Sequence, residues 1–179
     1  MKVIIPLAGF GTRLRPHTYT KPKPLVRVAG KPVLGHILDK LAGLPIDEII
    51  FIVGYLGDQI RDYVSANYHF PSRYVEQKEL KGQAHALHLA ADHISGPVLI
   101  VFVDTIFEAN LSALADLKED GVIYVKEVDD PRRFGVVITE NGYTCLLYTS
   151  DAADDLRCVD LGGSRIIKQK KKTHTSYHQ

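Results

Sequence analysis

The 179-residue chain has little cysteine and no long apolar run, and these absences exclude several classes of protein. Its two cysteines, Cys145 and Cys158, do not form a C-x-x-C pair, so we expect neither a disulfide framework nor a zinc site. No apolar run reaches the length of a transmembrane helix. Met1 and Lys2 lead directly into a strand-length apolar run instead of a signal peptide. We therefore expect a cytoplasmic protein with no membrane partner.

The chain also lacks an excess of charge of either sign. It has 22 Lys and Arg residues and 21 Asp and Glu residues, which give a formal net charge of +1 at pH 7 with neutral histidines. So small a net charge creates no overall field that would attract nucleic acid, and we expect no nucleic-acid partner. The positions of the basic residues are therefore more informative than their number.

A glycine-containing loop followed by basic residues is the most informative segment of the chain. The apolar run Val3–Leu7 ends in the loop Ala8–Thr12, with the sequence AGFGT. Glycine lets backbone N–H groups approach a ligand closely, and successive exposed N–H groups bind anions. The cations that follow are Arg13, Arg15, Lys21 and Lys23. Because guanidinium and ammonium groups bind phosphate strongly, the segment predicts a triphosphate-binding loop.

Two common phosphate-binding motifs do not match this loop. A Walker A loop requires G-x-x-x-x-G-K-[ST], which the sequence lacks. The dinucleotide fingerprint G-x-G-x-x-G fails because Leu14 stands where its third glycine belongs. The loop therefore belongs to another class of phosphate site.

The residues that match a different signature are Leu7-Ala8-Gly9, Gly11-Thr12-Arg13-Leu14, Pro16, Thr18, Pro22-Lys23-Pro24-Leu25 and Gly30-Lys31-Pro32. In this order they resemble the signature of the sugar-1-phosphate nucleotidylyltransferases, the nucleotide-sugar pyrophosphorylases. That signature is roughly L-A-G-G-x-G-T-R-L-x-P-x-T-x-x-x-P-K-P-L, followed by G-K-P-x-L. The one departure in the loop is Phe10, where the family often has a second glycine.

Strand-like and helix-like patterns alternate along the chain. Strand patterns cover 3–7, 48–53, 73–77, 98–103, 122–128 and 134–139, and helical patterns cover 32–44, 56–68, 83–93 and 111–118. The alternation predicts an α/β fold, in which a mostly parallel, Rossmann-like sheet lies in a three-layer αβα arrangement. The almost wholly apolar run 98–103 predicts a central strand covered on both faces. The resemblance implies the nucleotide-diphospho-sugar transferase type of this fold, in truncated form.

The resemblance also implies which residues of the loop bind substrate. The nucleotide-binding residues that it implies are Leu7, Ala8, Gly9, Gly11 and Thr12. Arg13 would neutralise the charge that develops on the leaving pyrophosphate. Lys23 would bridge the sugar phosphate and the α-phosphate. Arg13 and Lys23 are therefore the candidate catalytic residues.

Asp104 is the candidate metal ligand. It ends the apolar run 98–103, at the sheet edge where the phosphate loop is also expected. Taken alone, Asp104 would be a helix cap or a loop residue. The family carries an aspartate here, usually as G-D-x-x-F/Y, although Val103 replaces that glycine. Since Mg²⁺ prefers one or two carboxylates together with phosphate oxygens, we expect Mg²⁺ as cofactor.

Gln77 and Gly82 resemble the base-reading segment of the family, in which a glutamine lies five residues before a glycine. The glutamine amide offers a donor and an acceptor, which suits uracil or thymine. Without the resemblance, Gln77 would be interpreted as a surface residue. His85 and His88 could share a helix face, but no further metal ligands accompany them, and we interpret both as incidental.

The segment 130–137, DPRRFGVV, resembles the D-P-x-R-Y/F-G-V segment of the family. The resemblance implies that Gly135 lies against the sugar, with its backbone N–H facing a hydroxyl. The interpretation from the residues alone is a turn that leads into a strand. Both interpretations can hold at once.

Composition changes near Thr144. The stretch 145–154, CLLYTSDAAD, has no clear periodicity, and a lysine-rich polar stretch ends the chain. A basic tail that binds nucleic acid is one interpretation. We favour translated sequencing-adapter sequence, which predicts a non-native, disordered tail over 144–179 after an N-terminal part of a nucleotidylyltransferase domain over 1–143. The family's later E-K-P segment and second metal aspartate do not occur in the sequence.

These observations predict transfer of a nucleotidyl group from an NTP, with dTTP or UTP favoured, to a sugar 1-phosphate. The products are an NDP-sugar and pyrophosphate, and the parent enzyme could form a homo-oligomer. We expect the chain itself to be inactive, because the sugar-gripping elements do not occur in it. Two alternatives stay open: a non-catalytic regulatory subunit that binds nucleotide sugars, and a nucleotidylyltransferase for another phosphate acceptor.

Overall fold

The computed structural model describes residues 1–104, 106–109, 111, 114, 121–127, 130, 136–140, 143–148 and 167–168. The chain divides into two compact units, an N-terminal unit, Met1–Ser112, and a C-terminal unit, Ala113–Gln179. Among the described residues, no helix has both the length and the apolar character needed to cross a membrane.

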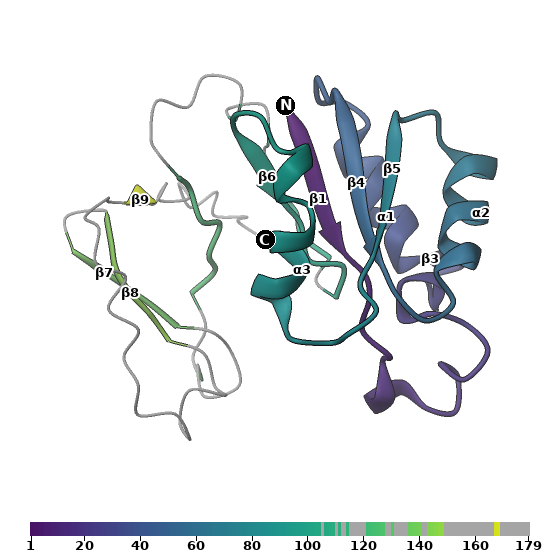
Figure 1. Cartoon of the computed structure of the whole chain (residues 1–179). Helices are drawn as coiled ribbons and strands as arrows, with labels where there is room; N and C mark the ends of the chain where they lie inside the picture. The colour runs from purple at the N-terminus through teal and green to yellow at the C-terminus, as the bar shows by residue number, and fades with distance from the viewer. Residues whose placement is uncertain are drawn as a thin grey trace, which may run out of the picture. The chain divides into compact units, whose positions relative to one another are not determined.

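A parallel sheet forms the centre of the N-terminal unit. Its strands are β1 (Lys2–Pro6), β4 (Glu48–Val53), β5 (Ser72–Glu76) and β6 (Val98–Ile100), in the order β5-β4-β1-β6. Figure 1 shows the four strands pointing the same way, so their carboxyl ends meet at one edge. The predicted parallel sheet is therefore confirmed.

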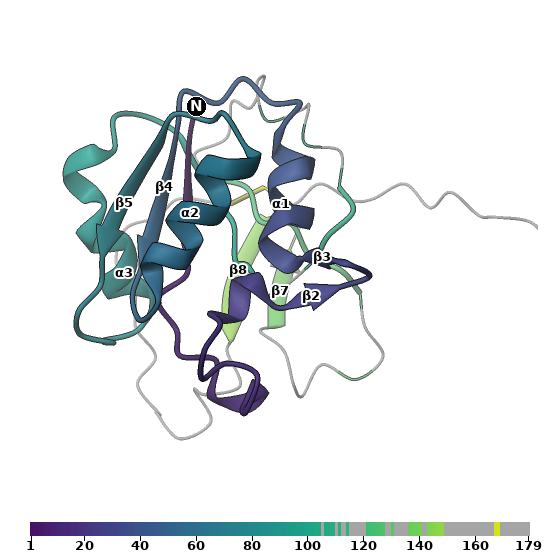
Figure 2. The same ribbon diagram turned by 90° about the vertical axis from the view of Figure 1, so that its right-hand side faces the viewer.

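Helices cover both faces of this sheet. The helices are α1 (Val33–Leu41), α2 (Gly57–Asn67) and α3 (Gln83–Leu89), with short 3₁₀ turns η1 (Thr12–Leu14), η2 (Lys23–Leu25) and η3 (Ala91–His93). Figure 2 shows α1 and α2 on one face and α3 on the other. The predicted three-layer αβα arrangement is thus confirmed.

The core follows from the alternation of side chains along the strands. Ile4, Ile50 and Ile52 pack with Ala86 and Ala90 of α3 and its C-terminal end. The alternate residues of β1 and β4 are fully buried on the other face, which α1 and α2 cover. Burying one such aliphatic side chain contributes about 1.5–3 kcal/mol, so this doubly covered pair of strands supplies much of the stability of the N-terminal unit.

A short hairpin lies between η2 and α1 in the chain. Its strands are β2 (Arg27–Val28) and β3 (Lys31–Pro32), and they pair antiparallel. Ala29 and Gly30 both have positive φ, at 49° and 81°. A two-residue hairpin turn with positive φ at both positions matches the right-handed twist of its strands, which explains a glycine at position 30.

The prediction of a central strand at 98–103 is wrong for the described part of the chain. There, β6 lies at the edge of the sheet, and Ile100 and Phe102 are 39% and 40% exposed. The backbone N–H and C=O groups of even-numbered residues of β1 point toward β6, as the 3.0 Å hydrogen bond from Val101 N to Ile4 O shows. The next donor toward β6 would be the N–H of Pro6, which proline lacks, so the ladder ends.

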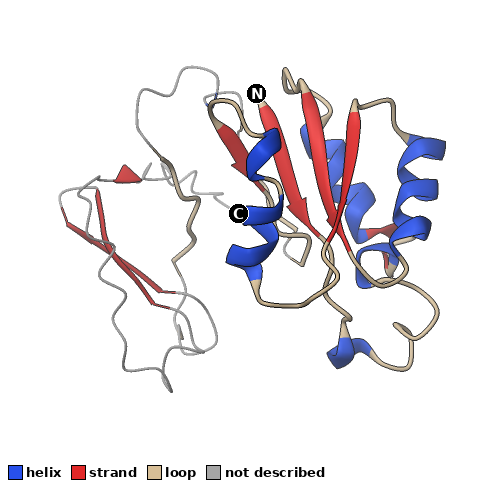
Figure 3. Ribbon diagram, in the orientation of Figure 1, coloured by secondary structure: helices blue, strands red, loops and turns tan. Residues whose placement is uncertain are grey.

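The C-terminal unit contains an antiparallel sheet in the order β7-β8-β9. Its strands are β7 (Val136–Glu140), β8 (Tyr143–Tyr148) and β9 (Ile167–Lys168), with an irregularity between Ile138 and Thr139. Figure 3 shows these strands in red between undescribed segments in grey. β8 crosses the predicted boundary at residue 143, and the non-native origin of 144–179 stays a prediction.

Two other predicted elements differ from the structure. Residues 121–127 have no regular secondary structure, so the predicted strand at 122–128 is wrong over its described part. No strand in the described chain pairs with this segment, and an apolar pattern without a partner cannot form a ladder. The helix predicted at 111–118 lies outside the described residues, except for Leu111 and Leu114.

Glu48 connects three strands and a helical turn at the amino ends of the sheet. Its carboxylate lies 3.1 Å from Lys2 Nζ on β1 and accepts a hydrogen bond from Arg73 Nε on β5 at 2.9 Å. Lys2 Nζ also donates to His93 O at 2.7 Å. Burial opposes ionisation of Glu48, but the hydrogen bonds from Lys2 and Arg73 outweigh it and lower the pKa of its carboxyl.

We predict that Glu48→Gln lowers the free energy of unfolding by about 1 kcal/mol near pH 7, because hydrogen bonds to a charged group are lost. Because the pKa of Glu48 is lowered in the folded protein, its ionisation stabilises the fold at pH values above the ordinary glutamate pKa of about 4.3. This stabilisation is lost as the pH falls through the pKa of the folded protein. The difference between wild type and variant should therefore shrink at acidic pH. Urea unfolding across a pH series measures it.

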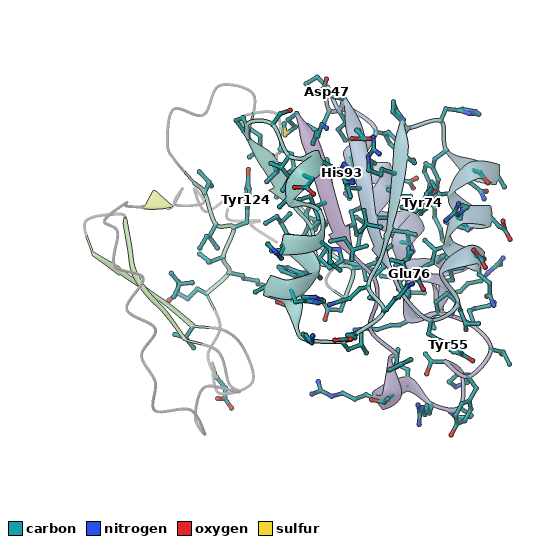
Figure 4. All side chains as sticks on the ribbon, viewed as in Figure 1. Asp47, Tyr55, Tyr74, Glu76, His93 and Tyr124 are labelled. Carbon is teal, nitrogen blue, oxygen red and sulfur yellow. The ribbon has the colours of Figure 1, made fainter. Side chains whose placement is uncertain are left out.

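Glu76→Gln is the matched control, since Glu76 is an exposed residue that ends β5 at the opposite edge of the sheet (Figure 4). If both variants lost the same free energy of unfolding, or if the loss in Glu48→Gln did not depend on pH, the role assigned to Glu48 would be contradicted.

Candidate functional site

A cavity of about 330 Å³ lies at the carboxyl ends of the strands in the N-terminal unit. Five segments line it: Pro6–Gly9 at and after the end of β1, Lys23 and Pro24 in η2, Gln77 after β5, residues Leu80, Gly82, Gln83 and Ala86 before and within α3, and Phe102–Asp104 after β6. Figure 4 marks this end of the sheet by Glu76 and Tyr55, whereas Asp47 lies at the opposite end. The volume suits a small-molecule site, which in proteins occupies roughly 300–1,000 Å³.

The cavity brings together most of the residues implied by the resemblance. Those that line it are Leu7, Ala8, Gly9, Lys23, Gln77, Gly82 and Asp104. Gly11, Thr12 and Arg13 do not line it, and Thr12 and Arg13 are exposed in η1. Gly135 lies outside the described residues. The functional roles of all these residues stay predictions.

The loop after β1 rests on the end of β4. Leu7 N donates to Ile52 O at 2.7 Å, and Ala8 is 5% exposed. A Cβ on Gly54 would lie 2.8 Å from Ala8 O, so only glycine allows this approach. The sequence interpretation did not single out Gly54, although a glycine directly after the apolar strand 48–53 was a signal that could have found it.

Gly11 holds the basic segment against the loop. It has φ +63°, and a Cβ there would lie 2.9 Å from Lys23 Cβ. Thr18, which is 3% exposed, donates from Oγ1 to Gly11 O at 2.9 Å. Gly11 and Thr18 therefore bring Lys23 to the wall of the cavity, and their place in the signature has a structural reason.

The start of α2 anchors the end of the segment that carries Arg13. Tyr55 Oη donates to Tyr19 O at 3.2 Å, and Gln59 Nε2 donates to Thr20 O at 2.9 Å. The ring of Phe10 lies 5.9 Å from the ring of Tyr55, in a tilted arrangement. Phe10, the departure from the family signature, thus packs against this anchor.

Lys23 and Asp104 form an ion pair across the cavity wall. Lys23 Nζ lies 3.4 Å from Asp104 Oδ2, with side chains 36% and 57% exposed. So exposed a pair contributes about 0–1 kcal/mol, so it does not hold the loop in place. It keeps a cation and a carboxylate side by side where phosphate groups would bind.

The residues present fit a magnesium site only in part. In the described portion of the chain, no group of three His, Cys, Asp or Glu residues could hold a metal ion. Asp104 offers one exposed carboxylate at the cavity. Mg²⁺ commonly takes one or two carboxylates and completes its shell with water and substrate phosphates, so this single carboxylate is compatible with it.

Gln77 is buried, which excludes the interpretation as a surface glutamine. The residue is 5% exposed, and its backbone N–H donates to Val53 O at 2.8 Å. Its amide nitrogen lies 3.2 Å from Gly82 O and 3.1 Å from His85 Nδ1. His85, which the sequence alone suggested was incidental, therefore contacts a residue that lines the cavity.

The fold is a Rossmann-like α/β domain with a cavity at the carboxyl ends of its parallel strands, and comparison with known proteins places the chain in a family. Residues 2–147 match the nucleotidyl transferase family, and the chain belongs to it.

The chain is 38% identical over 148 residues to AglF, a UTP–glucose-1-phosphate uridylyltransferase of Haloferax volcanii, and the alignment covers 79% of this chain and 61% of AglF. It is 40% identical over 141 residues to the bifunctional protein GlmU of Methanocaldococcus jannaschii, covering 79% of this chain and 33% of GlmU. The chain thus spans less than two thirds of the length of these relatives.

A solved structure has the same fold. It is a Bacillus anthracis protein assigned as a glucose-1-phosphate thymidylyltransferase and crystallised with sucrose. The match has a TM-score of 0.75 and 28% identity, and it covers 84% of this chain and 64% of that chain.

We predict that Gly54→Ala disturbs the cavity wall, because the new methyl group would meet the backbone of Ala8, which cannot move aside as a side-chain end can. Overpacking of this kind costs about 1–3 kcal/mol of unfolding free energy. Thermal unfolding of the variant measures the loss.

Gly43→Ala serves as the control, since a Cβ at Gly43 would meet nothing within 4 Å. A Gly54→Ala protein as stable as wild type would show that the loop after β1 is not held against β4.

Proposed function

We propose that this chain carries the nucleotide site of an enzyme that transfers a nucleotidyl group from UTP or dTTP to a sugar 1-phosphate. The observation that carries the proposal is the cavity that Gly9, Lys23, Gln77, Gly82 and Asp104 line together. The names of AglF and of the Bacillus anthracis protein support a sugar 1-phosphate as the acceptor and a uridylyl or thymidylyl group as the transferred group.

In the proposed reaction, a phosphate oxygen of the sugar 1-phosphate attacks the α-phosphorus of the NTP. A new oxygen–phosphorus bond forms as the bond between the α-phosphorus and the oxygen bridging to the β-phosphate breaks. The electron pair leaves with pyrophosphate. Such transfers depend on positioning and on stabilisation of charge, so the protein needs cations and close backbone contacts in place of a nucleophile.

The charged residues of the site have separate roles in this proposal. Lys23 would contact the sugar phosphate and the α-phosphate, which brings the two reacting groups together. Arg13 would bind the β- and γ-phosphates, where negative charge collects as pyrophosphate leaves. Asp104 would hold Mg²⁺, which supplies charge neutralisation and orients phosphate oxygens. The ion pair of Lys23 with Asp104 would open when the phosphates and the metal bind.

We predict that the full chain binds UTP or dTTP in the presence of Mg²⁺, and that Asp104→Asn raises the Mg²⁺ concentration needed for half-maximal binding. The substitution keeps the size of the side chain and removes the charge that attracts the metal. Isothermal titration of nucleotide across a Mg²⁺ series measures this midpoint. Addition of glucose 1-phosphate, with detection of pyrophosphate, then tests for transfer.

Asp62→Asn is the control, because Asp62 is an exposed carboxylate on α2 that does not line the cavity. A chain that binds no nucleoside triphosphate would overturn the proposed function. An unchanged Mg²⁺ midpoint in Asp104→Asn would remove only the metal role of Asp104.

We also predict that Arg13→Ala weakens binding of UTP and of pyrophosphate about tenfold and leaves binding of UMP nearly unchanged. Loss of one hydrogen bond to a charged group costs about 1.5–3 kcal/mol, and 1.4 kcal/mol is a factor of ten. Since UMP lacks the β- and γ-phosphates, it reports whether Arg13 acts there. Titration calorimetry with the three ligands makes the comparison.

Arg27→Ala, in the β2–β3 hairpin, is the matched control for the loss of one exposed arginine. An equal loss of affinity for UMP and UTP in Arg13→Ala would place Arg13 at the α-phosphate or would show a general electrostatic effect.

A further inference from the structure

The amide of Gln77 has both of its hydrogens directed at protein acceptors. Its nitrogen, Nε2, lies 3.2 Å from Gly82 O and 3.1 Å from His85 Nδ1. An amide nitrogen carries two hydrogens, and these two contacts supply one acceptor for each. The amide that was expected to offer a donor and an acceptor to a base is therefore left with its acceptor alone.

The identity of the two contact atoms fixes the orientation of this amide. A backbone carbonyl can only accept, so the Gln77 atom that faces Gly82 O must be the nitrogen. The same nitrogen faces His85 Nδ1, which must then accept, so the ring proton of His85 lies on Nε2. His85 in this tautomer opposes rotation of the amide, because a rotated Gln77 would place its oxygen against a ring nitrogen without a proton.

The amide oxygen of Gln77 has no hydrogen bond with any part of the protein that the structure describes. Gln77 is 5% exposed as a whole residue, and it lines the cavity. A ligand that presents an N–H group to this oxygen can donate a hydrogen bond to it, whereas a ligand that presents a lone pair cannot.

We propose that His85 is a positioning residue for base selection, which locks the Gln77 amide with its oxygen available for a ring N–H. Uracil and thymine carry such an N–H at N3, and cytosine has an acceptor at the same place. His85 touches no substrate in this proposal and acts only through Gln77. The specificity role rests on the proposed function, since it needs a nucleotide in the cavity.

His88 provides a matched comparison on the same helix. It lies three residues beyond His85 in α3, is exposed and does not line the cavity. A His88→Ala variant therefore removes an imidazole from α3 at a position outside the cavity wall. His85→Asn supplies the conservative replacement, because the new side-chain oxygen can accept a hydrogen bond at about the place of Nδ1.

The first experiment measures the ratio of the dissociation constants of CTP and UTP, with Mg²⁺ present, by titration calorimetry on the full chain. His85→Ala should lower this ratio about tenfold, the change that 1.4 kcal/mol produces, whereas His85→Asn and His88→Ala should keep it near the wild-type value. In a Gln77→Ala background, His85→Ala should have no further effect on the ratio. Equal weakening of both nucleotides, or an effect that persists without Gln77, would overturn the proposal.

The second experiment needs no nucleotide. Nitrogen NMR of the imidazole at about pH 8, where free imidazole is neutral, shows which ring nitrogen carries the proton. We expect the proton of His85 on Nε2, and we expect the Gln77 side-chain amide resonances to shift in His85→Ala and to stay in place in His88→Ala. A proton on His85 Nδ1, or unchanged Gln77 resonances, would overturn the proposal.

The two measurements separate this proposal from the proposed function. A chain that binds neither UTP nor CTP overturns the proposed function and the specificity role together, whereas the NMR result still decides whether His85 positions Gln77. Thermal unfolding of each variant shows whether the helix is intact. Should His85→Ala fail to fold, His85→Phe, which keeps an aromatic ring without the acceptor, replaces it.

Discussion

The burial of β1 and β4 between two helical layers is the constraint on which the site depends. Both strands are apolar on both faces, so each must be covered by helices above and below the sheet. Parallel strands that are covered in this way end at one edge, and the chain must leave that edge through loops. The loop after β1, the segment that begins at Gln77 after β5, and Asp104 after β6 follow three strands of this sheet, and the cavity forms where these segments meet.

Close backbone contacts then give the loops their positions. Gly54 allows Ala8 to approach the end of β4, and Gly11 allows Lys23 to pack against the loop. Both contacts are possible because glycine has no side chain that would collide with the neighbouring atoms. The Lys23–Asp104 ion pair is exposed and weak, so it contributes little to the position of the loops. The cationic side chain is therefore held at the cavity by its backbone and its neighbours, which leaves its charge available for phosphate.

The described residues make a site with a buried end and an open end. Gln77 is buried, and its amide nitrogen donates a hydrogen bond to Gly82 O. Lys23 and Asp104 are exposed, and Arg13 lies on an exposed turn beyond the cavity. Charged groups that must bind and release phosphates gain from exposure to solvent, because full burial of an unpaired charge would be costly.

The sequence by itself determined the layer arrangement and most of the elements, and it predicted a phosphate-bearing ligand. Periodicity located β4 and α2 closely because a buried strand and an amphipathic helix have different spacings of apolar residues. The glycine loop and its cations indicated phosphate because those groups act locally along the chain. By contrast, the central strand predicted at 98–103 is an edge strand in the described part of the chain, since an apolar run does not reveal which neighbours it will have.

Only the tertiary structure decided which residues meet. Pro6 ends the pairing of β1 with β6, an effect that depends on which side of β1 its missing N–H would have pointed to. His85 looked incidental along the chain, yet it lies 3.1 Å from the amide of Gln77. Hydrogen bonds between side chains depend on distances of a few tenths of an ångström. Those distances are set by the packing of α3 on the sheet, which no local pattern in the sequence encodes.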